Sequence, residues 1–366
     1  MTPLRVALVA EDYYPQLGGV PEHVHHLARE LEALGHQATI VSSHMRMHGS
    51  VDPPYVRRVG RSLVIYANGG VARVTVGWRL TARFEALFRK ERFDVVHVHG
   101  GLNPTLGLVA PRAAWRAGIP VVATFHTWFP RSIGCRVFQR PLQRMLDRHA
   151  ATIAVSTAAR EAMARYFTAP WEIIPNGVDT TFFRPAIARN GEATPHLLWL
   201  GRIEPRNDLA TVLAAMPHIL HRHPGAWLTV VGDGPWRSRM ERLARRLGPC
   251  VHFAGYANGD RPAYYRAADV YLCPTQRASF GVTLLEAMAC GTPLVVSDIP
   301  AFRDLAEHAV FAPPGDADAW GQAINALIDD TQRRELMKRE GRRVAERYAW
   351  PLVAQRVLAV YRRVTG

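Results

Sequence analysis

Lysine is almost missing from this sequence. Among 366 residues and 45 basic side chains, only Lys90 and Lys338 are lysines, and both stand in highly charged, helix-like stretches. A pyridoxal phosphate enzyme needs a buried Schiff-base lysine, and a P-loop needs a lysine within its glycine-rich turn. Neither lysine fits such a site, so both classes of protein are excluded.

Cysteines and long apolar runs are also scarce. The four cysteines, Cys135, Cys250, Cys273 and Cys290, lie far apart and form no Cys-x-x-Cys pair. This spacing argues against a disulfide framework and against a structural zinc site. No stretch approaches the roughly 20 apolar residues of a membrane-spanning helix. The first apolar run, at residues 6–10, is too short for a signal peptide, and together these features predict a cytoplasmic protein.

The charge balance is strongly basic. The 45 Lys and Arg residues outnumber 31 Asp and Glu residues and give a net charge of +14, nearly all of it from arginine. Such a surplus suits phosphate groups, anionic lipid headgroups or nucleic acid equally well and says nothing about the fold. With 48% hydrophobic and 21% charged residues the chain is an ordinary globular protein, and its length favours two domains.

Short β-branched runs alternate with longer amphipathic stretches along the chain. This pattern predicts an α/β protein whose parallel strands are buried on both faces. The expected strands lie at residues 6–10, 38–43, 94–100, 120–127, 151–156, 171–178, 197–202, 227–234, 251–255, 270–275 and 293–298. The pattern lapses at 184–195, which indicates a linker. We therefore expect one domain at 1–184 and a second from 185, with a ligand-binding cleft between them.

Two features of the first half are candidates for that cleft. Gly18 and Gly19 follow the first expected strand and precede a helix, so backbone N–H groups could meet a phosphate there. A simple turn is the plainer interpretation of the pair. His126 ends an apolar strand, where its side chain could enter the cleft, although a hydrogen-bonded core histidine is again the plainer interpretation.

Arg202 and Arg206 are candidates in the second half. Both follow the first strand expected there, at the mouth of the same cleft. Their guanidinium groups could hold a diphosphate through forked hydrogen bonds. A solvated loop is the alternative.

A further candidate is the helix expected after residue 278. Ser279 is predicted to cap it, with the backbone amides of Phe280 and Gly281 at its start. Glu286 lies two turns into this mostly apolar helix. Because burial of a carboxylate is unfavourable, we expect Glu286 to face the cleft.

Eight segments, taken in order, resemble family 4 of the retaining GT-B glycosyltransferases. They are GGVPEHVHHLA, VVATFHT, IPNGVD, GRIEPR, VVGDGP, ADVYLCPT, ASFGVTLLEAMACGTPLVVSDIPAF and YAWPLVAQRVLAVYRRV. The resemblance covers essentially the whole chain, and the last three segments are the most specific. It implies two Rossmann-like domains facing across a cleft, the second at 185–349, with a C-terminal helix at 350–366 that crosses back to the first.

The resemblance also implies an activity. A hexose would pass from a nucleotide sugar, a UDP- or GDP-sugar, to an acceptor on the first domain, with retention and without a metal ion or other cofactor. His126 would contact the donor sugar and the reaction centre, and Arg202 the diphosphate. The other residues implied to bind the donor are Gly18, Gly19, Arg206, Tyr256 in the base-reading loop, Phe280, Gly281, Val282, and Glu286, which would bind the ribose.

Two positions depart from the family pattern. Asn207 stands where the family usually has a lysine, and Ala278 where it usually has a glutamate. Arg206 could supply the missing charge, and Gln276 or Arg277 could reach the sugar in place of the glutamate. The departures leave open the alternative that this chain is a non-catalytic relative that binds a nucleotide sugar or a lipid.

Arginine-rich stretches bear on the choice of partner. Arg136, Arg140, Arg144 and Arg148 recur every four residues beside an apolar face and predict a basic amphipathic helix, and residues 79–93 predict a second. Solvated helix faces are one interpretation, and peripheral binding to anionic lipid at the inner membrane face is the other. A nucleic-acid binder is the weaker alternative, because no aromatic platform or recognition motif accompanies the arginines.

Overall fold

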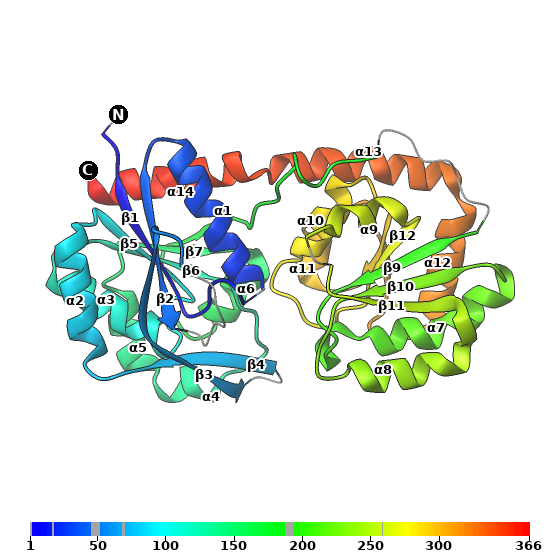
Figure 1. Ribbon diagram of the computed structural model, residues 1–366, viewed down its shortest axis with the longest axis horizontal. Helices are drawn as coiled ribbons and strands as arrows, with labels where there is room; N and C mark the ends of the chain where they lie inside the picture. Colours follow the sequence, from blue (N-terminus) through cyan, green and yellow to red (C-terminus); the bar gives the residue numbers. More distant parts are fainter. Residues whose placement is uncertain (1, 17, 45–51, 68–69, 187–193, 258) are drawn as a thin grey trace. The chain divides into compact units, whose positions relative to one another are not determined.

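The computed structural model describes residues 2–16, 18–44, 52–67, 70–186, 194–257 and 259–366. The chain divides into two compact units, unit 1 with Met1–Gly177 and Trp350–Gly366, and unit 2 with Val178–Ala349. Each unit has its own sheet flanked by helices (Figure 1). The predicted α/β class is therefore confirmed.

Unit 1 contains an eight-stranded sheet in the order β4-β3-β2-β1-β5-β6-β7-β8, parallel except for the antiparallel pair β3 and β4. The strands are β1 (Arg5–Ala10), β2 (Gln37–His44), β3 (Val56–Ala67), β4 (Gly70–Val76), β5 (Val95–His99), β6 (Val121–Phe125), β7 (Ala151–Ala154) and β8 (Trp171–Ile173). The helices are α1 (Gly19–Ala33), α2 (Leu80–Glu91), α3 (Leu106–Arg116), α4 (Ile133–Val137), α5 (Gln139–Leu146), α6 (Thr157–Ala164) and α14 (Trp350–Thr365).

Alternate side chains of β1 enter two different cores, as the two-residue period of a strand requires. Val6 and Leu8 pack with α1 and α14, whereas Ala7 and Val9 pack with α2 and α3. Burial on both faces explains why this strand is apolar from Val6 to Ala10. Helix α14, from the far end of the chain, completes the core of unit 1 beside α1 (Figure 1).

Unit 2 contains a six-stranded parallel sheet in the order β11-β10-β9-β12-β13-β14. The strands are β9 (His196–Leu200), β10 (Trp227–Val231), β11 (Val251–Gly255), β12 (Val270–Cys273), β13 (Leu294–Ser297) and β14 (Val310–Ala312). The α-helices are α7 (Leu209–Arg222), α8 (Arg237–Ala244), α9 (Arg261–Ala267), α10 (Val282–Ala289), α11 (Pro300–Arg303), α12 (Ala317–Asp329) and α13 (Thr331–Arg347), and 3-10 turns cover Pro205–Asn207 and Arg245–Cys250.

The break between the units falls after Gly177, earlier than the boundary after residue 184 that the sequence predicts. Residues just past the break pack on unit 2. The ring of Phe183 lies 6.1 Å from that of Tyr265, and Arg342 donates hydrogen bonds to the carbonyl oxygens of Thr180 and Phe183. Within the predicted linker at 184–195, residues 187–193 lie outside the described part of the chain.

The arginine-rich stretch around Arg136 forms two short helices instead of the single helix expected. Helix α4 ends before Phe138, and α5 starts after it. Pro141 explains the break, because its ring would collide with the carbonyl oxygen of Val137 in a continuous helix. The other stretch, at 79–93, forms α2, whose apolar face is buried in the core of unit 1. No helix in the described segments combines the length and the apolar character needed to cross a membrane.

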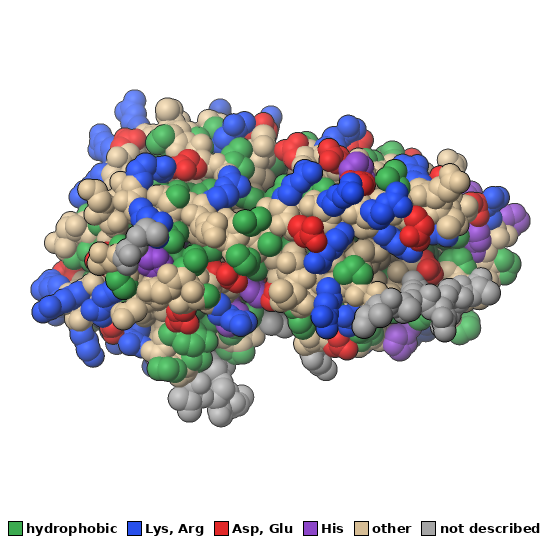
Figure 2. All heavy atoms as spheres, turned by 90° about the horizontal axis from the view of Figure 1, so that it is seen from above, with side chains coloured by type: hydrophobic (Ala, Val, Ile, Leu, Met, Phe, Trp, Pro, Cys, Tyr) green, Lys and Arg blue, Asp and Glu red, His purple; other side chains and the backbone are tan. Residues whose placement is uncertain are grey.

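The basic surplus does not form a continuous patch on the face seen in Figure 2. Blue basic side chains are the more numerous there, but red acidic ones are interspersed among them. Ion pairs along α13 illustrate this local balance, with Lys338 joined to Glu335 and Arg343 to Glu340.

Two glycines let the loops after β9 and β10 lie against each other. Gly232 has a φ of +126°, and a Cβ at this position would collide with the carbonyl oxygen of Gly201. A Cβ on Gly234 would collide with the carbonyl oxygen of Ile203. The loop that carries Arg202 is therefore fixed by backbone packing that only glycine permits.

Gly232→Ala is expected to destabilise unit 2 more than Gly291→Ala. Both glycines have a positive φ, +126° and +72°, but a Cβ on Gly291 would have its nearest neighbour 3.6 Å away, on Pro185. Left-handed backbone alone costs about 1–2 kcal/mol, so Gly291→Ala should lower the free energy of unfolding by that amount and Gly232→Ala by more. Urea unfolding measures both, and equal losses would contradict the collision.

Candidate active site

Each sheet has one point where the strand order reverses, and open α/β sheets bind ligands beyond the carboxyl ends of the strands there. In unit 1 this point lies at β1, between β2 and β5, and in unit 2 at β9, between β10 and β12. The predicted site residues follow strand ends on these edges or lie on the next helix: Gly18, Gly19 and His126 in unit 1, and Arg202, Arg206, Tyr256, Phe280, Gly281, Val282 and Glu286 in unit 2.

His126 belongs to a cluster of histidines in unit 1. Its Nε2 lies 3.1 Å from Nδ1 of His99, the last residue of β5, and its ring centroid lies 4.8 Å from that of His23 on α1. His23 Nδ1 is in turn hydrogen-bonded to Oδ1 of Asn176 at 2.8 Å. Of the three rings, that of His126 is partly exposed and the other two are buried. His126 is therefore neither isolated nor fully enclosed.

Burial keeps these imidazoles neutral. Desolvation lowers the pKa of His23 to about 4. It lowers the pKa of His97, a fourth histidine on β5, to about 3. It also holds the pKa values of His99 and His126 well below the ordinary value, and neighbouring histidines add to the decrease. At neutral pH, His126 thus presents an uncharged ring with one donor and one acceptor nitrogen.

Gly18 and Gly19 form the start of α1. Gly18 occupies the N-cap position, and a Cβ added to Gly19 would have no heavy atom within 4 Å. The backbone is therefore open to an approaching group at a helix N-terminus, where amide donors and the helix dipole favour an anion.

Arg202 and Arg206 share one buried carboxylate in unit 2. Glu204, whose side chain is 4% exposed, forms an ion pair with Nε of Arg206 and another, at 3.5 Å, with Nε of Arg202. The side chains of Arg202 and Arg206 are 42% and 58% exposed. Glu204 therefore positions both guanidinium groups and leaves the terminal nitrogens of each for an anion.

Asn207 is used within the same loop. Its Nδ2 donates a hydrogen bond to the Arg202 carbonyl oxygen at 2.8 Å. Asp208 follows it and accepts a hydrogen bond from the side-chain Nε2 of Gln276 at 2.8 Å. The backbone N–H of Gln276 donates to the Arg206 carbonyl oxygen. Gln276 therefore joins the loop after β12 to the arginine loop, and its side-chain nitrogen already donates to Asp208.

Helix α10 starts at Val282 with Gly281 at the N-cap, so the prediction of Ser279 as the cap is wrong. Gly281 has a φ of +124°, a conformation that side chains rarely adopt, and the helix start follows from this backbone geometry. Phe280 is 6% exposed, and its ring lies 6.0 Å from that of Tyr348. The Phe280 ring is thus part of the packing of unit 2.

The expectation that Glu286 faces an open cleft is wrong. Its side chain is 2% exposed, and its carboxylate is paired with Nη1 of Arg261 at 3.0 Å. The Tyr265 hydroxyl donates a second hydrogen bond to it at 2.8 Å. Both partners lie on α9, and together they offset the unfavourable burial of the charge.

Tyr256 lies in the loop after β11, next to Gly255, whose φ is +73°. The ring is 58% exposed. An exposed aromatic face can stack on a planar group, which is what a base-reading role would require.

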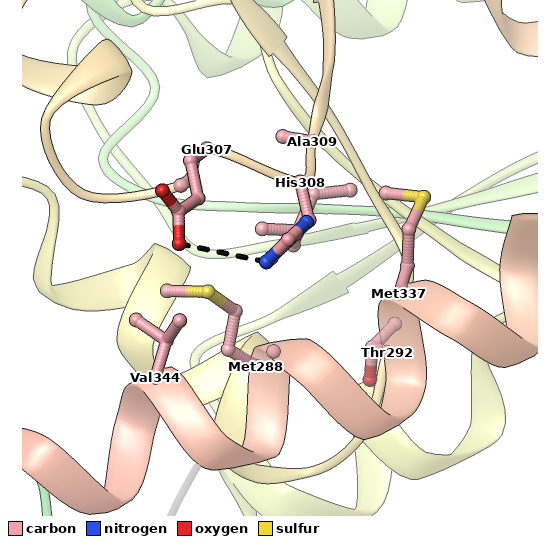
Figure 3. Close-up of a pocket in the computed structure, with 10 residues that line it drawn as sticks. Met288, Thr292, Glu307, His308, Ala309, Met337 and Val344 are labelled. Atoms are coloured by element: carbon pink, nitrogen blue, oxygen red, sulfur yellow. Dashed lines mark ion pairs between the residues drawn. The ribbon is translucent and has the colours of Figure 1, made fainter.

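Unit 2 also contains a pocket that other residues line (Figure 3). It is lined by Met288, Thr292, Leu294, Ala306, Glu307, His308, Ala309, Met337, Gly341 and Val344. Glu307 and His308 form an exposed ion pair at 3.5 Å, and most of the remaining lining is apolar. The pocket contains none of the predicted site residues.

Sequence reasoning missed the residues that hold the predicted ones in place. Asn176 and Glu204 lie inside the segments IPNGVD and GRIEPR, so the resemblance was the available signal for both. Arg261 lies in none of the segments. Its role follows only from the packing of α9 against α10.

Comparison with known proteins decides the family. Residues 17–182 match the description Glycosyltransferase Family 4, and residues 182–344 match Glycosyl transferases group 1. Phosphatidyl-myo-inositol mannosyltransferases from Mycolicibacterium smegmatis and Propionibacterium freudenreichii are each 33% identical to this chain. They cover 99% and 98% of it, over 95% and 94% of their own lengths. The chain belongs to the family 4 glycosyltransferases.

Solved structures agree with this glycosyltransferase assignment. Sucrose-phosphate synthase from Thermosynechococcus elongatus has a TM-score of 0.80 at 21% identity and covers 99% of each chain. HepE from Anabaena in complex with UDP has a TM-score of 0.78 at 17% identity, covering 98% of this chain and 100% of its own. The GT-B fold expected from the motifs is thus confirmed, and the roles of individual residues stay predictions.

Acidification is expected to destabilise unit 1 of this glycosyltransferase through its buried imidazoles. Because the pKa of His97 falls from 6.5 to about 3 on folding, the unfolded chain binds a proton first as the pH drops below about 6.5. The free energy of unfolding should therefore fall with decreasing pH, by at most about 1.4 kcal/mol per pH unit for this group.

Urea unfolding of the wild type and of His97→Asn, at pH values from about 7.5 down to about 5, measures this dependence. The variant should show the shallower slope. His221→Asn, at an exposed position on α7, is the control and should keep the wild-type slope. Identical slopes for wild type and His97→Asn would contradict the assignment.

Proposed function

We propose that this glycosyltransferase moves a mannosyl group from a nucleotide sugar, with retention, to a phosphatidylinositol-like lipid acceptor. The observation that carries the proposal is the 33% identity to phosphatidyl-myo-inositol mannosyltransferases over 99% of the chain. The positions of the predicted residues at the ligand-binding edges of both sheets support it. Unit 2 would bind the donor and unit 1 the acceptor.

The donor diphosphate is assigned to the arginine loop of unit 2. The exposed guanidinium groups of Arg202 and Arg206, fixed by Glu204, offer forked donors that match phosphate oxygens. Backbone amides at the start of α10, beside Gly281, add to the positive potential. These groups would stabilise the charge that develops on the leaving diphosphate, so the proposed reaction needs neither a divalent cation nor an organic cofactor.

The proposed transfer is a front-face displacement. The bond from the anomeric carbon to the diphosphate breaks, and a bond to the acceptor oxygen forms on the same face of the sugar. The acceptor proton passes to a diphosphate oxygen. His126 would bind the sugar through a neutral ring, because burial holds its pKa well below the ordinary value. It therefore orients hydroxyl groups without competing with the arginines for the diphosphate.

Glu286 is assigned to the ribose through exchange of partners. Its two carboxylate oxygens are occupied by Arg261 and Tyr265. Because the Glu286 side chain is only 2% exposed, a ribose hydroxyl can reach the carboxylate only if one of these partners moves. Arg261, 28% exposed, is the partner with room to move.

Arg202→Gln is expected to weaken binding of a nucleoside diphosphate by about 10- to 150-fold, because a charge-assisted hydrogen bond contributes about 1.5–3 kcal/mol. Glu204→Gln should also weaken binding, since it frees both arginines from their shared carboxylate. The control is Arg222→Gln. Arg222 is the last residue of α7 and forms an ion pair with Asp329 on α12. Titration calorimetry with GDP and UDP measures the affinities.

Transfer itself is tested with GDP-mannose and UDP-sugars on phosphatidylinositol vesicles in the presence of EDTA. Product from one donor, lost in Arg202→Gln and kept in Arg222→Gln, is the expected result. Activity that disappears in EDTA and returns with manganese would overturn the metal-independent mechanism. Diphosphate binding without transfer from any donor would favour the non-catalytic relative.

Helices α4 and α5 are assigned to the lipid surface. Ile133, Val137 and Phe138 are 82%, 66% and 58% exposed, an unusual grouping for apolar side chains. Arg136 and Arg140 are exposed beside them. Exposed apolar side chains next to arginines suit a negatively charged membrane, where each basic residue contributes about 1 kcal/mol to binding.

Binding to vesicles that contain anionic lipid should fall as the salt concentration rises, because added salt screens these charges. Arg136→Gln with Arg140→Gln should weaken it by about 30-fold, the equivalent of about 2 kcal/mol. The control is Arg333→Gln with Arg339→Gln, which removes two exposed arginines from α13. Co-sedimentation measures binding, and equal losses in both double variants would show that only the net charge matters.

A further inference from the structure

Three histidines of unit 1 bring their rings together from separate elements. Within the described residues, His23, His99 and His126 each offer one nitrogen, and these nitrogens all lie within 4.8 Å of one another. The shortest separation is 3.1 Å, between Nδ1 of His99 and Nε2 of His126. Ring centroids lie 4.8 to 5.4 Å apart. Helix α1, the end of β5 and the residue after β6 supply them.

Two of the three rings have a buried nitrogen without a hydrogen-bond partner. Nε2 of His23 and Nε2 of His99 are both in this state. A buried polar atom left unpaired is unfavourable and rare in folded proteins. The unpaired Nε2 of His23 points to a ligand that accepts its lone pair, whereas His99, whose Nδ1 faces His126, would keep Nε2 as its outer N–H.

Asn176 orients His23 for such a ligand. Its carbonyl oxygen, Oδ1, lies 2.8 Å from Nδ1 of His23, so Nδ1 is assigned as the protonated donor. The lone pair of the ring then lies on Nε2. A carbonyl group that holds the outer N–H of an imidazole is the usual second shell of a metal-binding histidine.

His97 shows what a purely structural histidine looks like in the same core. Its ring centroid is only 4.2 Å from that of His99. Both of its nitrogens lie 2.6 Å from hydroxyl groups, Nδ1 from Tyr361 and Nε2 from Thr124. The difference between His97 and the buried rings of His23 and His99 is therefore in their partners, not in their burial.

We propose that His23, His99 and His126 form a binding site for a borderline transition-metal ion, with Zn²⁺ as the best fit. Three imidazoles and one open position are a known zinc arrangement, and a tetrahedral ion holds its nitrogens about 3.3 Å apart. The shortest separation, 3.1 Å, is close to this value, and the other nitrogens, which lie within 4.8 Å of one another, would move closer when the ion binds. His126, the partly exposed member, gives the ion its way in.

The site has a consequence that rests on the proposed function. A metal ion on His126 would occupy the ring assigned to the donor sugar. Zn²⁺ would therefore inhibit transfer, whereas the proposed reaction itself uses no metal. Binding of the ion does not depend on this assignment and is measured separately.

The test uses the full-length, tag-free protein, freed of metal with a chelator. Competition with a chromophoric zinc indicator should give one Zn²⁺ per chain, and Co²⁺ should give the intense visible absorption of a tetrahedral site. His99→Gln should lower Zn²⁺ affinity by more than about 100-fold, because even second-shell changes cost about 10- to 100-fold. Asn176→Ala, a second-shell change, should lower the Zn²⁺ affinity by about 10- to 100-fold.

His149→Gln is the matched control. His149 also has one nitrogen bonded, to the Met145 carbonyl oxygen, and a buried Nε2 without a partner, but it stands outside the cluster. It should leave the Zn²⁺ affinity unchanged. Circular dichroism checks that each variant is folded.

No stoichiometric Zn²⁺ binding by the wild type, or an octahedral Co²⁺ spectrum, would overturn the proposal without reference to any variant. Equal losses in His99→Gln and His149→Gln would overturn it too. Zn²⁺ binding in a protein that transfers no sugar would leave the metal site standing and count against the proposed function alone.

Discussion

Parallel strands need a crossover between them, and this constraint places the chemistry of each unit at one edge of its sheet. In unit 1 the crossovers carry α1 and α3 to opposite faces, so β1 is buried on both sides. Gly19 at the start of α1, His99 at the end of β5 and His126 just after β6 then lie at the same edge. In unit 2 the loops after β9 and β10 touch through Gly232, and the loop after β12 joins them through Gln276. The strands supply rigidity, and a small number of residues beyond their ends supply the chemistry.

The two edges differ in their electrostatics. Unit 1 presents neutral imidazoles, because the surrounding core makes protonation of each ring unfavourable. Unit 2 presents two arginines around one buried carboxylate. The proposed transfer of a sugar from a nucleotide would use both kinds of surface. Uncharged hydroxyl groups suit the neutral rings, and the diphosphate, which gains charge as the bond breaks, suits the arginines.

The sequence was most informative where a local pattern matched the environment. Strand β1 could be predicted because both of its faces are buried and every residue from Val6 to Ala10 is apolar. Strands β3 and β4 could not, because β3 has the adjacent arginines Arg57 and Arg58 near its start and exposes Leu63 and Val64. Strand β14 has only three residues, too few for a pattern. Motif resemblance pointed to residues that lie at these edges, but partners such as Asn176 and Arg261 come from other elements, and no pattern within one segment reports them.

Glu286 shows this limit most clearly. All the remaining buried residues of its helix are apolar, so the sequence of that helix alone argues against burial of the carboxylate. The carboxylate is nevertheless buried, because α9 supplies a guanidinium group and a phenol at hydrogen-bond distance. Burial of a charge depends on the neighbouring element, and Arg261 carries no signal of its own in the sequence.

The same reasoning bears on the two departures from the family pattern. Asn207 in place of a lysine removes one positive charge, and Ala278 in place of a glutamate removes one negative charge, so the two changes leave the net charge of the donor loops unaltered. Asn207 bonds to the Arg202 carbonyl oxygen and helps to hold the loop. Arg206 uses Nε for Glu204 and is 58% exposed, so its other donors face solvent. A diphosphate would then meet two arginines on a braced loop, and the loss of the lysine need not weaken its binding. In the proposed donor complex the sugar would lack one acceptor, at Ala278, and this would affect recognition of the sugar more than the charge around the diphosphate.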